Sequence, residues 1–108
     1  MKTIKETFKN ELTIKNSKFI AILFPLSNED KIDEIINNLK SQYKNATHYC
    51  YAYIIDNIKH SNDDGEPSGT AGQPILNVLE GNDLNNVLCV VIRYFGGIKL
   101  GAGGLIRA

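Results

Sequence analysis

The residues best suited to chemistry lie at the C-terminal end of the 108-residue chain, in the segment RYFGGIKLGAGGLIRA, residues 93–108. This segment holds five of the nine glycines and both arginines, and it contains no acidic residue. Glycine lets backbone N–H groups face an anion, and a helix N-terminus adds a favourable dipole. Two interpretations stay open, a site for an anion such as an RNA phosphate and a purely structural turn. The candidate binding residues are the cations Arg93, Lys99 and Arg107 and the glycines that shape the backbone, Gly96, Gly97, Gly101, Gly103 and Gly104.

The glycine segment matches neither of the common nucleotide-binding motifs. A P-loop requires G-x-x-x-x-G-K-[ST], but Lys99 lies between Ile98 and Leu100. A dinucleotide fingerprint requires G-x-G-x-x-G or a final alanine, and the run that begins at Gly101 ends in Ile106. An enzyme acting on a small phosphorylated or nucleotide ligand is therefore the second hypothesis, and no catalytic residue, cofactor or metal is predicted.

A second segment, DDGEPSGTAG (residues 63–72), concentrates acidic residues and turn formers. The carboxylates of Asp63, Asp64 and Glu66 could gather around a hard cation, but they do not match a calcium-binding loop. The interpretation we favour places them before a helix N-terminus, where negative charge is stabilising. A third interpretation pairs them with Arg93 or Lys99. In that case the loop would face the glycine segment and add three binding residues, Ser68, Gly69 and Thr70.

Two further patterns occur in the apolar run at residues 46–56. His48 and Cys50 share one face of the predicted strand, but at this spacing their Cβ atoms lie ~7 Å apart, too far for a nucleophile and its base. We therefore interpret them as a buried thiol and a structural histidine. Tyr49, Tyr51 and Tyr53 form a stripe on the other face, which predicts packing beneath a helix or against a partner, or a platform for nucleic-acid bases.

The elements that must position these residues follow from hydrophobic periodicity. Alternation predicts a hairpin over residues 7–24, and apolar residues at helical spacing predict a helix over roughly 28–43, with a capping box begun by Ser27. Residues 57–69 are predicted to be a loop, followed by a short helix capped by Ser68 or Thr70. The apolar run 87–95 predicts a strand covered on both faces. The order β-β-α-β-α-β predicts an α+β fold with two layers, a four-stranded sheet with helices on one face.

Composition excludes some classes of protein and leaves others open. The twelve basic and twelve acidic residues give zero formal net charge, so only a local patch could attract nucleic acid. The sequence has no apolar run long enough to span a membrane, and its charged N-terminus does not resemble a signal peptide. Cys50 and Cys89 are predicted to be free thiols in a reducing compartment, and the predicted location is the cytoplasm.

Taken together, DDGEPSGTAGQPIL (63–76), VVIRYFGGIKLGAGGLIRA (90–108) and THYCYAY (47–53) resemble the YigZ/IMPACT family over essentially the whole chain. The resemblance implies a domain of the ribosomal-protein S-five domain-two-like type. It also implies a role around translation, through RNA, the ribosome or a translation-regulator protein. Bacterial members usually run to about twice this length, so residues 1–108 are expected to be a single N-terminal-type domain cut at the start of its last helix. An uncovered sheet face would then favour homo-oligomers.

The prediction is thus a translation-associated regulatory domain without catalysis. Besides the small-ligand enzyme, a pure protein-interaction module that uses the tyrosine face stays open as an alternative.

Overall fold

The computed structural model of the chain describes residues 3–14, 17–65 and 71–94. In chain order, the elements are β1 (Phe8–Ile14), β2 (Ser17–Pro25), the 3-10 helix η1 (Glu29–Lys31), α1 (Ile32–Gln42), β3 (His48–Ile55), β4 (Ile58–Asn62), α2 (Gly72–Gly81) and β5 (Val87–Tyr94). The strands form one five-stranded sheet in the order β1-β2-β5-β3-β4, and every neighbouring pair is antiparallel. The α+β class is confirmed, whereas the four-stranded count is wrong.

The strand missed by the sequence prediction is β4, which lies within the segment predicted to be a loop. Asp56 and Asn57, both with positive φ, form the two-residue connection that pairs Ile55 with Ile58. Positive φ at both loop residues is the geometry of a type I′ hairpin, which suits Asp and Asn. All five residues of β4 are exposed, so no alternation of apolar and polar residues marks the strand.

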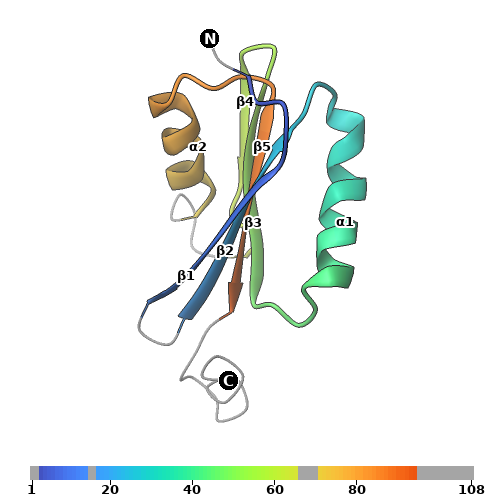
Figure 1. The fold of residues 1–108 in the computed structure, drawn as a ribbon, viewed down its shortest axis with the longest axis vertical. Helices are drawn as coiled ribbons and strands as arrows, with labels where there is room; N and C mark the ends of the chain where they lie inside the picture. The colour runs from blue at the N-terminus through green and yellow to red at the C-terminus, as the bar shows by residue number, and fades with distance from the viewer. Residues whose placement is uncertain (1–2, 15–16, 66–70, 95–108) are drawn as a thin grey trace.

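The helices lie on opposite faces of the sheet, so the prediction of helices on one face in two layers is also wrong (Figure 1). Ile32 and Leu39 of α1 belong to one core cluster, together with alternate residues of the central strands. Leu76 and Leu79 of α2 belong to a second cluster with Val87, which faces the other way. β5 contributes buried residues to both clusters. The prediction that this apolar strand is covered on both faces holds on the α1 face, whereas on the α2 face Cys89 and Val91 are half-buried and line an open groove.

Both helices begin differently from the prediction. Asn28, not Ser27, caps η1, because its Oδ1 accepts a hydrogen bond from the backbone N–H of Asp30 at 2.8 Å. α2 begins after Ala71, which provides no side-chain cap. The other predicted caps, Ser68 and Thr70, lie outside the described residues. The acceptor at the N-terminus of α2 is instead Asp63, in the acidic loop that precedes the helix.

The tyrosine stripe packs against α1. Tyr53 is buried in the α1-side cluster, and Tyr49 and Tyr51 pack against that cluster, with the hydroxyl of Tyr49 donating to the carbonyl of Tyr43. Burial raises the pKa of Tyr53. These residues form part of the core, which confirms the packing interpretation and contradicts an open platform for bases.

Neither helix in the described part of the chain is long and apolar enough to cross a bilayer.

Candidate anion-binding site at the Arg93 end of the sheet

Arg93 is the one predicted binding residue that falls within the described ranges, and it lies near the end of the central strand β5. Its register partners are Phe19 on β2 and His48 on β3. The other predicted binding residues lie outside the described ranges, and their roles stay predictions: Gly96, Gly97, Lys99, Gly101, Gly103, Gly104 and Arg107 after β5, and Ser68, Gly69 and Thr70 before α2.

The guanidinium of Arg93 lies against a side chain of β2, and the backbone of Arg93 is bonded to the start of β3. Its Cζ lies 5.3 Å from the centroid of the Phe19 ring, within the range of a cation–π contact. On the other side, the carbonyl of Arg93 accepts a hydrogen bond from the backbone N–H of Thr47 at 2.8 Å, which holds the start of β3 against β5. Because Arg93 is half-buried, packing against its neighbours restricts the rotation of its side chain.

The acidic loop packs against the start of β3. His48 donates from Nδ1 to the carbonyl of Asp64 at 2.7 Å, and the Sγ of Cys50 donates to the carbonyl of Asp63 at 3.2 Å. Between them, the backbone N–H of Tyr49 donates to Oδ2 of Asp64 at 2.7 Å. The two side chains that share this face therefore bind the loop, and Cys50 is buried. These contacts agree with the structural interpretation of His48 and Cys50, which did not foresee the loop as their partner.

Asp63 supplies the N-terminal acceptor of α2. Its Oδ1 accepts hydrogen bonds from the backbone N–H groups of Gly72 at 2.7 Å and Ala71 at 3.1 Å. A carboxylate at this position neutralises donors that lack a partner within the helix and interacts favourably with the helix dipole. The predicted place of the acidic residues, before a helix N-terminus, is confirmed for Asp63.

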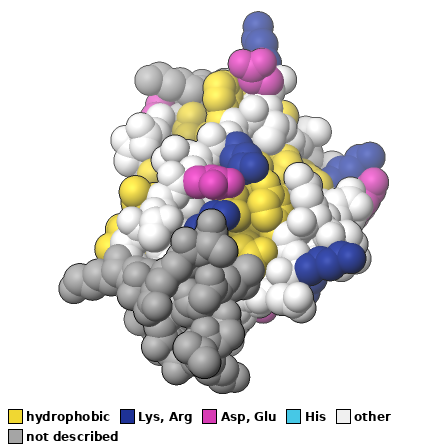
Figure 2. Space-filling model, turned by 60° about the horizontal axis from the view of Figure 1, so that its bottom comes forward, with side chains coloured by type: hydrophobic (Ala, Val, Ile, Leu, Met, Phe, Trp, Pro, Cys, Tyr) yellow, Lys and Arg dark blue, Asp and Glu magenta, His cyan; other side chains and the backbone are white. Residues whose placement is uncertain are grey.

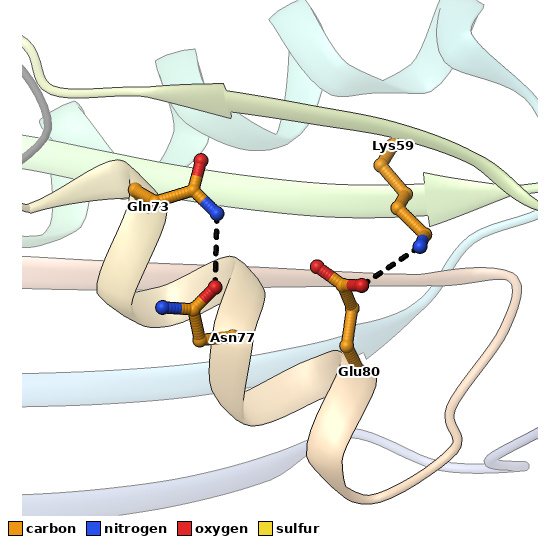
Figure 3. Close-up of polar contacts among 4 residues, drawn as sticks. All are labelled: Lys59, Gln73, Asn77 and Glu80. Atoms are coloured by element: carbon orange, nitrogen blue, oxygen red, sulfur yellow. Dashed lines mark hydrogen bonds and ion pairs between the residues drawn. The ribbon is translucent and has the colours of Figure 1, made fainter.

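The far end of α2 is tied to β4 by an ion pair. Lys59 Nζ lies 2.7 Å from Oε2 of Glu80, and within the helix Gln73 donates to Asn77 at 2.9 Å (Figure 3). Both charged side chains are partly exposed, so this pair contributes little on its own. Asp63 connects the start of α2 to the acidic loop, and the Lys59–Glu80 pair connects its end to β4. The loop and the strand both lead to the candidate site.

The acidic loop and the strand end that carries Arg93 meet at His48. Asp64 binds His48 by a hydrogen bond, and Arg93 is its register partner. One glycine-bearing segment follows Gly65 in sequence, and the other follows Tyr94. We call Phe19, His48, Asp63, Asp64 and Arg93 the Arg93 site. The structure thus brings together the described residues that lead into both segments, as the facing-loop interpretation requires.

Further cations and apolar side chains lie at this end of the molecule. Lys18 is the register partner of Tyr94, whose hydroxyl donates to the carbonyl of Lys44 at 3.1 Å. Figure 2 shows basic side chains, with an acidic side chain between them, beside an apolar patch on the face that comes forward when this end is turned towards the viewer. Glu11 lies 3.9 Å from Lys18 and 3.5 Å from Lys9, so these two cations are partly neutralised. A mixture of cations and apolar surface suits a polyanionic partner with stackable groups, and a folded protein surface equally well.

Metal chemistry receives no support from the described side chains. Within residues 3–14, 17–65 and 71–94, no three His, Cys, Asp or Glu residues lie close enough together to hold an ion. Asp63 and Asp64 instead accept backbone hydrogen bonds. Glu66, the third carboxylate considered from the sequence, lies outside the described residues.

The α2 side of the sheet also carries an open apolar groove of about 600 Å³. Phe8 of β1, Leu23 of β2 and Val78 of α2 are among the residues that line it. Cys89 lies on its floor as a half-buried free thiol, and burial raises the pKa of Cys89 to about 11. Such a thiol is protonated at neutral pH and unreactive, so the groove offers apolar surface but no nucleophile.

Sequence reasoning missed two contributors to the Arg93 site. Phe19 appeared only as an apolar strand residue, because its contact with Arg93 depends on the pairing of β2 with β5 across about seventy residues of chain. Asn62 accepts from the backbone N–H of Asp64 at 2.7 Å and so shapes the acidic loop. The Asn-x-Asp spacing is a recognised turn signal, and it could have been found in the sequence.

The architecture places the chain in the α+β class, with one antiparallel sheet between two helices. A solved structure described as a hypothetical protein aligns with 95% of this chain and 52% of its own, with a TM-score of 0.81 and 33% identity. The two-domain translational regulator Yih1 aligns with 99% of this chain and 46% of its own, with a TM-score of 0.61. At 22% identity, the likeness to Yih1 concerns the fold alone.

Sequence comparison then gives the family. The family model described as the Impact N-terminal domain matches residues 15–108. The IMPACT family member YvyE of Bacillus subtilis (strain 168) is 54% identical over 98% of this chain and 50% of its own length. YigZ of Escherichia coli (strain K12) is 37% identical over 88% of this chain and 49% of its own. The chain therefore belongs to the IMPACT family, as its glycine-bearing motifs predicted, and spans about half the length of these relatives.

Proposed function

We propose that this chain acts in the regulation of translation by binding RNA or the ribosome, without catalysis, through the Arg93 site and the two glycine-bearing segments that follow it. The observation that carries the proposal is the meeting of Arg93 and the acidic loop at His48. Two segments follow in sequence from described residues at this end of the sheet, one with cations and no acids after Tyr94 and one rich in turn formers after Gly65.

Electrostatics favours an anionic partner at this end. The carboxylates of Asp63 and Asp64 accept backbone hydrogen bonds from the start of α2 and from β3, which anchors the acidic loop at this end of the sheet. Lys99 and Arg107 follow on the same segment as Arg93. A local cluster of cations on a chain of zero net charge would bind phosphates with a strong dependence on salt.

The relatives support the translational context. Yih1, which shares the fold, is described as a translational regulator. Protein IMPACT-B of Xenopus tropicalis is 36% identical over 83% of this chain and 30% of its own length. These similarities support a role in translation regulation, and the S-five domain-two-like type that the family resemblance implies would fit a domain that works at the ribosome.

The test measures binding of a short, mixed-sequence single-stranded RNA and of purified bacterial ribosomes across a series of salt concentrations. Wild type should bind with affinity that falls as salt rises, and Arg93→Ala with Lys99→Ala should weaken binding and flatten the salt slope by about one phosphate contact or more. The control is Lys5→Ala with Lys31→Ala, which removes the same charge from exposed positions outside the Arg93 site. Binding that ignores salt, or that the Arg93 variant leaves intact, contradicts the proposal.

Two further measurements separate the other two functions that the sequence left open. A nucleotide or sugar phosphate that raises the melting temperature by several degrees would favour a small-ligand protein instead. Capture of a defined translation-regulator protein by wild type and by the Arg93 variant alike would favour a protein-interaction module at another surface.

A further inference from the structure

β1 is an edge strand whose seven residues are all exposed. Phe8, Leu12 and Ile14 are each at least half exposed, and they share one face of the strand because their numbers are all even. Among the described residues, only β2 pairs with β1, so the outer edge carries backbone groups that are available to another strand. Proteins usually protect such an edge from pairing with another chain, because it combines exposed apolar side chains with unpaired backbone groups.

The sequence of this edge is complementary to itself. Consider two copies of β1 paired antiparallel about a two-fold axis through Asn10. Phe8 then lies opposite Leu12 of the second copy, and Lys9 lies opposite Glu11, each pair occurring twice. All apolar residues remain on the same face, and every charge meets its opposite.

Neighbouring two-fold registers lack this complementarity. An axis through Lys9 places two lysines opposite each other, and an axis through Glu11 places two glutamates opposite each other. Like charges directly opposite one another destabilise a strand pair. Lysine alone at an edge opposes association, but here Lys9 Nζ lies 3.5 Å from Oε1 of Glu11, so the edge presents both signs side by side.

The opposite edge of the sheet, β4, has no such pattern. An axis through its central residue, His60, would place Lys59 opposite Ser61 and Ile58 opposite Asn62, so neither pair is complementary. Association through β1 therefore closes after two copies and does not continue into a fibre.

We propose that the chain forms a two-fold dimer with a second copy of itself through antiparallel pairing of β1, centred on Asn10. The dimer joins the two sheets and extends the apolar surface on the α2 side, because Phe8 lines the groove there and meets Leu12 of the second copy. One strand pair is a small interface, so the dimer should appear at protein concentrations on the order of 100 μM.

Charge exchange tests the partner and the register together. Lys9→Glu and Glu11→Lys each convert both charge pairs into like pairs, and each should weaken the dimer about tenfold. Mixed in equal amounts, the two variants restore every opposite pair and should form a heterodimer. The double variant Lys9→Glu with Glu11→Lys should dimerise like wild type. Mass measured by sedimentation at several concentrations reports each state, and circular dichroism checks that these exposed substitutions leave the fold intact.

A cysteine substitution locates the axis. Asn10→Cys places two thiols opposite each other at a Cα separation of ~4.5–5.5 Å, which a disulfide can bridge. Leu12→Cys is the matched control, because it would face Phe8 and should cross-link far less. The proposal is overturned if wild type stays monomeric throughout, if either single charge variant dimerises as wild type does, if the mixture stays monomeric, or if the two cysteine variants cross-link equally.

Discussion

The two faces of the sheet are covered to different extents, although the same strands form both. On the α1 side, ten buried residues form one cluster that reaches from β2 across β5 to β3. On the α2 side, the buried cluster has five residues, and an open apolar groove lies between α2 and β1. α2 packs mainly against β3 and β4. On the same face of the sheet, residues of β1, β2 and β5 line the open groove.

The two faces of the sheet therefore have different roles: the α1 side mainly stabilises the fold, and the α2 side offers surface for partners. The α1-side cluster buries more and larger apolar side chains than the α2-side cluster, so most of the free energy of folding should come from the α1 side. The α2 side carries the acidic loop, the groove and the exposed apolar residues of β1, which are surfaces suited to partners. Substitutions that probe each side should therefore differ in kind.

The largest expected effect comes from the centre of the α1 side. Ile92→Ala removes a side chain of β5 that has no exposed surface, and it should lower the free energy of unfolding by about 2–5 kcal/mol through lost burial and a cavity. Val78→Ala, at a 61% exposed position on α2, should change it by less than about 0.5 kcal/mol. Denaturant unfolding of both variants measures the comparison, and equal losses would contradict the full burial of Ile92 on the α1 side.

The comparison also shows what could be read from the sequence. Long apolar patterns, such as the helix that contains Leu39 and the strand that contains Ile92, were predicted because periodicity records burial directly. β4 was missed because an exposed edge strand has no buried face to impose a pattern. The placement of α2 on the opposite face was missed because its packing depends on strand order, which local residues do not encode.

The residues of the candidate site also divide into those that the sequence predicted and those that it could not. Arg93 was singled out from composition, and the acidic loop was correctly placed before a helix. The partner of Arg93, Phe19, was not predictable, because it lies on a strand that is adjacent only in the folded sheet. Residue types thus indicated which chemistry to look for, whereas the pairing of distant strands decided which side chains surround it.

A second, smaller effect should appear where α2 meets β4. Gly72 is buried at the start of α2, and a Cβ there would lie 2.7 Å from the backbone N of Asn62 and 3.0 Å from its C and O. Gly72→Ala should therefore cost about 1–3 kcal/mol, because the backbone of β4 must move. Gly81→Ala is the matched control at the other end of the helix, where an added Cβ meets nothing within 4 Å. It should be neutral or slightly stabilising, and a thermal melt in which Gly72→Ala is equally tolerated would show that α2 is not packed tightly on β4.

The smallest effect should be the pH dependence contributed by Cys89 on the floor of the groove. Burial raises the pKa of Cys89 from 9.0 to about 11, so the native state holds its proton more tightly than the unfolded state does. The stabilisation is complete below pH 9 and is lost as pH rises towards 11, reaching a loss of about 1 kcal/mol at pH 10. Relative to wild type, Cys89→Ala should therefore recover about this amount between pH 8 and pH 10. Val91→Ala, on the same groove wall but without a titrating group, should keep a constant difference. Parallel behaviour of the two variants would mean that water enters the groove and solvates the thiolate, which would make the α2 side still more open than the groove indicates.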